Sequence, residues 1–192
     1  MHLGIDLDNT ILDATTAHLH YYNMESAQKF LPEDVTDFYI YRIYGWDNLE
    51  RDRVYHLYGH DIHWNSSPLP RAIEELHLLY NEHTISFVTA RPHIFRNVTL
   101  DWLKHHNIKY HNIIFTEDKL RECNKLDVDL LIDDAPHYAE EFSRSNKPVI
   151  LYDQPYNRNV NNEFVFRANN WSEVVKHIND IERFAKKSGC VI

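Results

Sequence analysis

Short apolar runs that alternate with helical segments are the feature that most constrains the fold of this 192-residue chain. The apolar runs predict strands over residues 3–7, 84–88, 112–115, 129–133 and 148–152. The segments between and after them predict helices over residues 70–80, 94–106, 118–125, 136–143 and 171–187. Strands that alternate with helices form parallel βαβ units. The sequence therefore predicts an α/β fold, in which helices cover both faces of a parallel sheet in three layers.

Residues 13–70 interrupt this alternation. They are rich in aromatic side chains and contain no strong strand signal, and they predict a mostly helical insert with helices near residues 15–30 and 48–58. The chain is thus expected to consist of a core domain, residues 1–12 and 71–192, and a small helical domain, residues 13–70, inserted after the first strand. Most of the insert's aromatic side chains are expected to form a small core of its own.

The charge balance excludes one broad class of function. The chain has 20 Lys and Arg against 29 Asp and Glu, a net charge of −9, whereas binding along a nucleic acid polymer requires a basic face. A small anionic ligand remains compatible with this charge if a metal ion supplies the positive charge. No signal-peptide pattern and no long apolar run is present, and the two cysteines, Cys123 and Cys190, lie far apart and are interpreted as reduced thiols. A cytoplasmic location without membrane contact is expected.

Three of the predicted strands end in polar residues. Asp6 lies at the carboxyl end of the first strand and Asp8 just after it, Thr89 follows the second strand, and Asp133 ends the fourth and is followed by Asp134. In parallel sheets, ligands bind beyond the carboxyl ends of the strands. These side chains are therefore expected to converge on one site.

The residue types at this edge indicate phosphoryl transfer. Neighbouring carboxylates repel one another unless a cation lies between them, and sites with oxygen ligands alone suit Mg²⁺. A threonine hydroxyl and a lysine, either Lys119 or Lys125, would contact phosphate oxygens. We assign Asp6 as the nucleophile that forms an aspartyl-phosphate, and Asp8 as the general acid and then the general base.

This set of residues resembles a known superfamily. Asp6-x-Asp8-x-Thr10, Thr89, Lys119 and Asp133-Asp134 occur in the order of the four motifs of the haloacid dehalogenase superfamily of phosphohydrolases, which have a Rossmann-like core. The insert stands where one large subclass carries a helical cap. More narrowly, the chain looks like the 5'(3')-deoxyribonucleotidase-like branch. The grounds are its Asp-Leu-Asp-Asn-Thr start together with the segments 70–72, 89–92 and 131–136.

The resemblance implies roles for particular residues. Asp6 would be the nucleophile and Asp8 the acid/base. Mg²⁺ would be held by Asp6, the backbone carbonyl of Asp8 and Asp133, with Asp134 ligating through water or orienting the metal's ligands. Thr89 would hold the phosphoryl group together with the backbone at Ala90. Lys119 is favoured over Lys125 as the third-motif lysine, because it opens a predicted helix.

Further substrate contacts are expected from residues around this set. Thr10, Ala90 and Arg91 are candidate substrate-binding residues, although Arg91 serves equally well to cap a loop. Tyr44 and Trp46 flank a glycine that permits a turn, and they are the insert residues expected to stack on a nucleobase. The segment 152–158, which follows a core strand, is expected either at the edge of the site or as a plain turn.

The sequence thus predicts a Mg²⁺-dependent phosphomonoesterase that acts on a small phosphate ester, with a (deoxy)nucleoside monophosphate as the first candidate. A sugar phosphatase and a non-catalytic protein that binds a phosphate ligand remain alternatives. A zinc module is least favoured, because none of its candidates has ligand spacing on a convincing scaffold; these are His18-x-His20, His60-x-x-His63 and His105-His106. The phosphomonoesterase would have the small phosphate ester as its only partner, and the chain would be a monomer or a homodimer.

Overall fold

The computed structural model describes residues 1–188, so Cys190 lies outside the described residues. Its centre is a six-stranded parallel sheet in the order β5-β4-β1-β6-β7-β8. The strands are β1 (His2–Ile5), β4 (Thr84–Thr89), β5 (Asn112–Phe115), β6 (Leu130–Asp133), β7 (Val149–Tyr152) and β8 (Val165–Ala168). β1 lies at the centre, with Leu3 opposite both Ile85 and Leu130.

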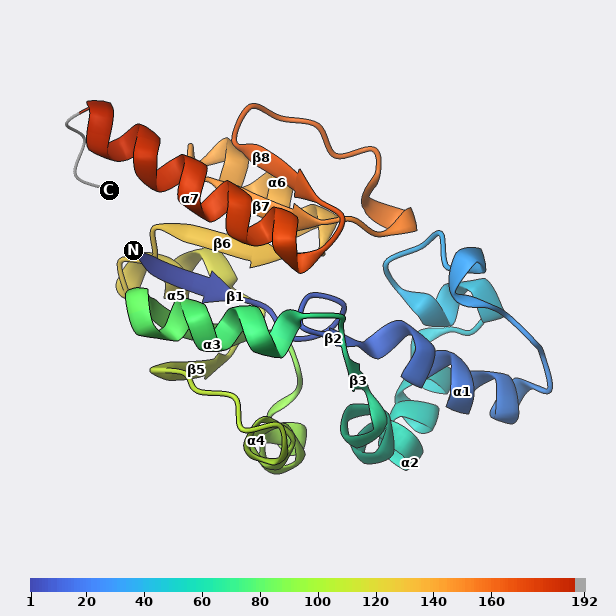
Figure 1. Cartoon of the computed structure of the whole chain (residues 1–192). Coiled ribbons are helices and arrows are strands. Elements are labelled where there is room, and N and C mark those ends of the chain that lie inside the picture. Colours follow the sequence, from blue (N-terminus) through green and yellow to red (C-terminus); the bar gives the residue numbers. More distant parts are fainter. Residues whose placement is uncertain (189–192) are drawn as a thin grey trace.

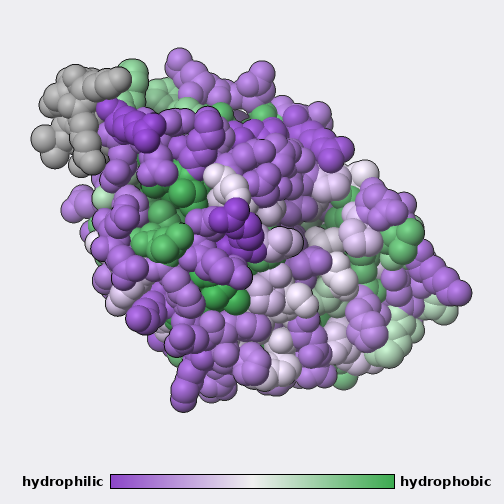
Figure 2. Space-filling model, in the orientation of Figure 1, coloured by the Kyte–Doolittle hydropathy of each residue, from purple (hydrophilic) through white to green (hydrophobic). Residues whose placement is uncertain are grey.

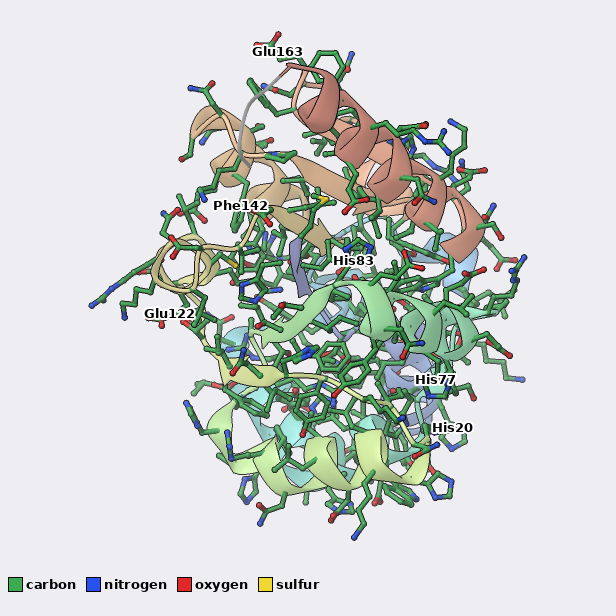
Figure 3. All side chains as sticks on the ribbon, turned by 60° about the vertical axis from the view of Figure 1, so that its left-hand side comes forward. His20, His77, His83, Glu122, Phe142 and Glu163 are labelled. Carbon is green, nitrogen blue, oxygen red and sulfur yellow. The ribbon has the colours of Figure 1, made fainter. Side chains whose placement is uncertain are left out.

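Helices cover both faces of the sheet, as predicted (Figure 1). α3 (Ala72–Glu82) and α7 (Trp171–Ser188) lie on one face, and α5 (Lys119–Lys125) and α6 (Pro136–Arg144) lie on the other. Side chains alternate along the strands, so that Ile132 faces the first helix pair and Leu131 the second. Phe142 packs from α6 into the second of these cores (Figure 3). The three-layer α/β fold is thus confirmed.

One strand was not expected from the sequence. Residues 165–168 fall in the turn-rich stretch that precedes the closing helix, yet they form β8, which pairs in parallel with β7. This strand has only four residues, lies at the sheet edge, and leaves Phe166 and Arg167 partly exposed. Such a short, half-exposed edge strand gives a weak apolar signal.

The insert contains α1 (Ala14–Ser26), two 3₁₀ helices (Pro32–Asp34 and Ile40–Tyr44) and α2 (Asn48–Asn65). It has a hydrophobic cluster of its own, with Leu19, Tyr22, Val54 and Ile62 among its buried members. Its two ends meet, because β2 (Leu12–Asp13) pairs antiparallel with β3 (Ser67–Pro68). Figure 1 shows the insert on the side to which the strands of the sheet point.

The helix bounds in the insert differ from the expected ones. α1 stops at Ser26 rather than near residue 30, because Ala27 takes a left-handed conformation with φ of 56°. α2 begins after Asp47, whose side chain accepts a hydrogen bond from the Glu50 amide, and it runs seven residues beyond the expected end at residue 58. This extension carries Gly59, which lies against Phe95, and His63, which lies near Asp8.

α4 (Arg96–His105) packs against α2. In the view of Figure 2, the core domain is mostly hydrophilic, and its hydrophobic side chains show mainly between α3 and α7. None of the helices in the described part of the chain is both long enough and apolar enough to cross a bilayer. Cys123, a residue of α5, is buried and has a free thiol.

Candidate active site

Three aspartates converge at the carboxyl ends of the two central strands. Asp6 follows β1 and its amide donates to the Ile132 carbonyl at 2.9 Å, which extends the ladder by one residue. Asp133 ends β6 and Asp134 follows it. One carboxylate oxygen from each of the three lies within 4.8 Å of the others, and all three side chains are buried. The sheet register thus places three acidic groups in one small volume.

Lys119 is the cation of this cluster. It opens α5, and its Nζ lies 2.6 Å from Asp6 Oδ1 and 2.7 Å from Asp133 Oδ2. Burial by itself would lower the pKa of Lys119, but the two carboxylates raise it, so the side chain stays an ammonium. Lys125 instead lies on the surface and pairs with Glu122 at 2.6 Å. Of the two candidate lysines, Lys119 is the one that reaches the aspartates.

The cluster has more carboxyl groups than cations. The pKa of Asp6 is raised to about 7: burial raises it most, the charge of Lys119 lowers it, and the charges of Asp133 and Asp8 raise it. Burial, followed by Asp133 and Asp6, also raises the pKa of Asp134 well above its ordinary value. Ionisation of all three aspartates beside the one ammonium would leave a net charge of −2, which the raised pKa values oppose. The oxygen donors of the aspartates and this charge fit one divalent cation, with Mg²⁺ preferred by such ligands.

Asp8 is held by a different cation. Arg91, from the segment after β4, donates from Nε to Asp8 Oδ2 at 2.8 Å and from Nη2 to Oδ1 at 2.6 Å. Its Nη1 donates to Thr99 Oγ1 at 3.0 Å, which anchors the guanidinium on α4. Burial would raise the pKa of Asp8, but the charge and hydrogen bonds of Arg91 outweigh it and lower the pKa. Arg91, a candidate substrate contact, is thus paired with Asp8 in this structure.

A cavity of about 390 Å³ opens between the strand ends and the insert. Asp6, Asp8, Thr89 and Ala90 line its floor. The insert supplies aromatic walls, which are Tyr22, Phe38, Tyr39, Tyr41 and Tyr55. Its volume is in the range of small-molecule sites.

Three candidate substrate residues are not brought to this cavity. Thr10 is fully buried, with its hydroxyl 3.5 Å from Asp134 Oδ1, and it lies behind the acidic cluster. Tyr44 and Trp46 stack on each other in the insert's own core, with ring centroids 4.9 Å apart. The Tyr44 hydroxyl donates to Asn23 there. The packing of the insert as a whole places Tyr44 and Trp46 in its core rather than at the cavity. The spacing of residues in the sequence does not reveal this packing.

The segment 152–158 does contribute to the site. The Tyr156 hydroxyl donates to Asp134 Oδ2 at 2.5 Å and accepts from Asn9 Nδ2 at 2.9 Å. Asn157 donates to the Asp134 backbone carbonyl at 2.8 Å. These contacts hold both the carboxylate and the backbone carbonyl of Asp134 in place. The only sequence signal for them is the position of the segment just after a core strand.

Among the histidines, His63 alone of those in the candidate zinc motifs is fully buried. It comes from α2, and its Nδ1 lies 3.9 Å from Asp8 Oδ1. It lies on a face of α2 that is buried rather than exposed. His20, His77 and His83 come from separate elements, α1, α3 and the turn after α3 (Figure 3). Across residues 1–188, the one group suited to hold a metal is the aspartate cluster, so the histidines gather no zinc site.

The fold has counterparts among solved structures. Structures of haloacid dehalogenase-like hydrolases superpose on most of the chain. One from Streptococcus pneumoniae has a TM-score of 0.68 at 13% identity, covering 92% of this chain and 97% of its own. The CbbY protein of Rhodobacter sphaeroides, solved in complex with phosphate, has a TM-score of 0.64 at 12% identity, covering 90% and 95%. At these identities the likeness establishes the fold.

The sequence comparison is narrower. The chain belongs to the family of 5' nucleotidase, deoxy (Pyrimidine), cytosolic type C proteins, whose family model matches residues 1–186. A nucleotidase of Clostridium acetobutylicum is 29% identical over 181 residues, which is 91% of each chain. The protein is therefore a phosphoric monoester hydrolase of the nucleotidase type.

Proposed function

We propose that this chain is a Mg²⁺-dependent nucleotidase that hydrolyses a (deoxy)nucleoside monophosphate through an aspartyl-phosphate on Asp6. The observation that carries the proposal is the buried cluster of Asp6, Asp133 and Asp134 with Lys119, at the floor of a cavity with aromatic walls. Burying three carboxylates with one ammonium costs free energy. A turn or a structural ion pair does not require such a cluster.

In the proposed reaction, Asp6 attacks the phosphorus and the ester oxygen leaves with a proton from Asp8. Water then attacks the phosphoryl group on Asp6, Asp8 takes the proton from that water, and phosphate leaves as the Asp6 carboxylate is restored. Thr89 and the Ala90 amide would orient the phosphoryl oxygens, and Lys119 would neutralise charge on Asp6. Mg²⁺, held by Asp6, the Asp8 carbonyl and Asp133, with Asp134 through water, would supply charge neutralisation of the phosphoryl group.

The aromatic walls favour a nucleoside as the leaving group. Tyr39, Tyr41 and Tyr55 line the cavity from the insert. Bases stack on aromatic side chains, each stacked base contributing about 1–3 kcal/mol. The family description names deoxy and pyrimidine nucleotides, and we extend that preference, together with the cytosolic location, to this chain. We also propose that the insert, residues 13–70, acts as a cap that excludes water from the site.

The proposal is tested by phosphate release from a panel of nucleoside monophosphates and sugar phosphates, with Mg²⁺, with EDTA, and with Asp6→Asn. We expect turnover that needs Mg²⁺, is highest on a deoxynucleotide, and disappears in D6N. Asp61→Asn, an exposed carboxylate on α2, serves as the matched control and should retain full turnover. A best substrate among the sugar phosphates would reject the nucleotide assignment. Nucleotide binding without turnover would indicate a binding protein.

A further inference from the structure

His63 carries an unpaired polar atom at the edge of the site. Its side chain is 1% exposed, and Nδ1 is the buried side-chain nitrogen or oxygen that lacks a hydrogen-bond partner in the part of the chain the structure describes. Buried polar groups are rarely left unpaired, because each costs about 1–3 kcal/mol. Asp8 Oδ1 lies 3.9 Å from this atom. That distance is about 1 Å beyond an ordinary hydrogen bond.

The rest of the His63 ring is firmly held. Tyr55, Gly59 and His63 follow at intervals of four residues, so they share one face of α2. The Tyr55 hydroxyl lies 2.7 Å from His63 Nε2, and this contact spans the glycine between them. The Phe95 ring occupies the space over Gly59, with its centroid 4.8 Å from Tyr55 and 4.9 Å from His63. The helix face thus presents Nδ1 toward Asp8 from a fixed position.

The neighbours of the ring decide which nitrogen carries the proton. Burial lowers the pKa of His63 well below its usual value, and Arg91 lowers it further, so the ring is neutral with one N–H. The anionic Asp8 faces Nδ1, which favours the proton there. Nε2 then accepts from the Tyr55 phenol, which burial keeps protonated by raising its pKa. The chain of donors runs from Tyr55 through His63 to Asp8.

Asp8 needs such a donor if it is to act as an acid. Arg91 contacts both of its carboxylate oxygens, so neither is free to carry a proton to a leaving group. We propose that His63 is a positioning residue for Asp8: Nδ1–H donates to Oδ1 when substrate is bound, so that Oδ2 can leave the guanidinium and face the leaving oxygen. This inference rests on the acid/base role of Asp8 proposed above.

The test separates leaving groups that need an acid from those that do not. Release of nucleoside from a nucleoside monophosphate and of p-nitrophenol from p-nitrophenyl phosphate is followed in single turnovers, with enzyme in excess, so that only the first step is observed. An alkoxide leaving group requires a proton from Asp8, and p-nitrophenolate leaves without one. Asparagine places its amide nitrogen near the Nδ1 position, and glutamine near Nε2. H63N and H63Q are therefore a matched pair, and His60→Gln on the exposed face of α2 is the control.

We expect H63Q to slow nucleoside release by about 10- to 100-fold, the cost typical of a misplaced catalytic group, and p-nitrophenol release by less than about threefold. H63N should recover most of the loss, and H60Q should match the wild type. Equal losses on both esters, or equal rates for H63N and H63Q, would overturn the inference.

D8N distinguishes failure of the His63 role from failure of the acid/base role of Asp8. If D8N spares p-nitrophenol release and H63Q is not selective, only the His63 role fails. If D8N itself shows no selectivity, the acid/base role of Asp8 fails with it.

Discussion

Single residues decide the electrostatics of the site, and Lys119 is the clearest case. Its ammonium is in contact with two buried carboxylates, Asp6 and Asp133. Removing one partner of a buried ion pair leaves an uncompensated charge, whereas an exposed pair contributes little. The two lysines that the sequence offered for this role therefore differ sharply in what their removal should cost.

We expect Lys119→Met to lower the free energy of unfolding of the metal-free protein by about 3–5 kcal/mol. Phosphate release should fall below detection. Lys125→Met removes only the exposed contact with Glu122, and should change stability by less than about 1 kcal/mol. Urea unfolding of the two variants and the wild type measures the difference. Similar midpoints for K119M and K125M would contradict the electrostatic role of Lys119.

At this scale, the sequence located the residues that the backbone itself positions. Asp133 and Thr89 end parallel strands and Asp6 directly follows one, so the sheet alone brings them to one edge. Thr10 and Tyr44 depend on how loops and the insert pack, and the structure turns both away from the cavity. The sequence analysis did not assign His63 to the site, because its contact with Asp8 arises from tertiary packing. The four-residue spacing from Tyr55 through Gly59 is the signal that points to a shared helix face.

Among the elements, α2 docks the insert on the core through a close approach. A Cβ atom at Gly59 would lie 2.3 Å from Phe95 Cζ, and the Phe95 ring is held between Tyr55 and His63. A glycine in a helix ordinarily costs about 1 kcal/mol relative to alanine. At this position, the space it leaves allows α2 to pack against the core segment after β4. The sequence predicted α2 only to residue 58, and β8 not at all, since neither the last turns nor a short edge strand has a strong apolar pattern.

We expect Gly59→Ala to destabilise the protein by about 1–3 kcal/mol through overpacking, despite its higher helix propensity. Phe95→Ala should destabilise it too, by leaving a cavity. The double variant should be more stable than the sum of the two losses indicates, because the alanine methyl enters the space of the ring. Denaturant unfolding of the four proteins gives this coupling directly. An unchanged or raised midpoint in G59A alone would show that α2 does not pack on Phe95 in solution.

On the scale of the whole molecule, the charge of the cluster links folding to pH and to metal. In the metal-free protein, the pKa of Asp6 is raised from 3.8 to about 7. Between about pH 4 and 7, the folded state therefore holds a proton that the unfolded state has lost, and stability falls as pH rises through this interval. Mg²⁺ binds the ionised carboxylates of the folded state, so it opposes this loss of stability. Its stabilising effect is largest once Asp6 is deprotonated.

Thermal unfolding at pH 5 and pH 8, with and without Mg²⁺, measures this linkage. At pH 8 we expect Mg²⁺, at about 100 times its Kd, to raise Tm by about 5–10 °C. At pH 5 the same concentration should raise it less, since binding must then displace a proton from Asp6. In D6N the amide cannot ionise, so the pH dependence of the Mg²⁺ effect should weaken together with the effect itself. Equal shifts in the wild type at both pH values would mean that the ion does not bind at Asp6, and that the acidic cluster is not the metal site.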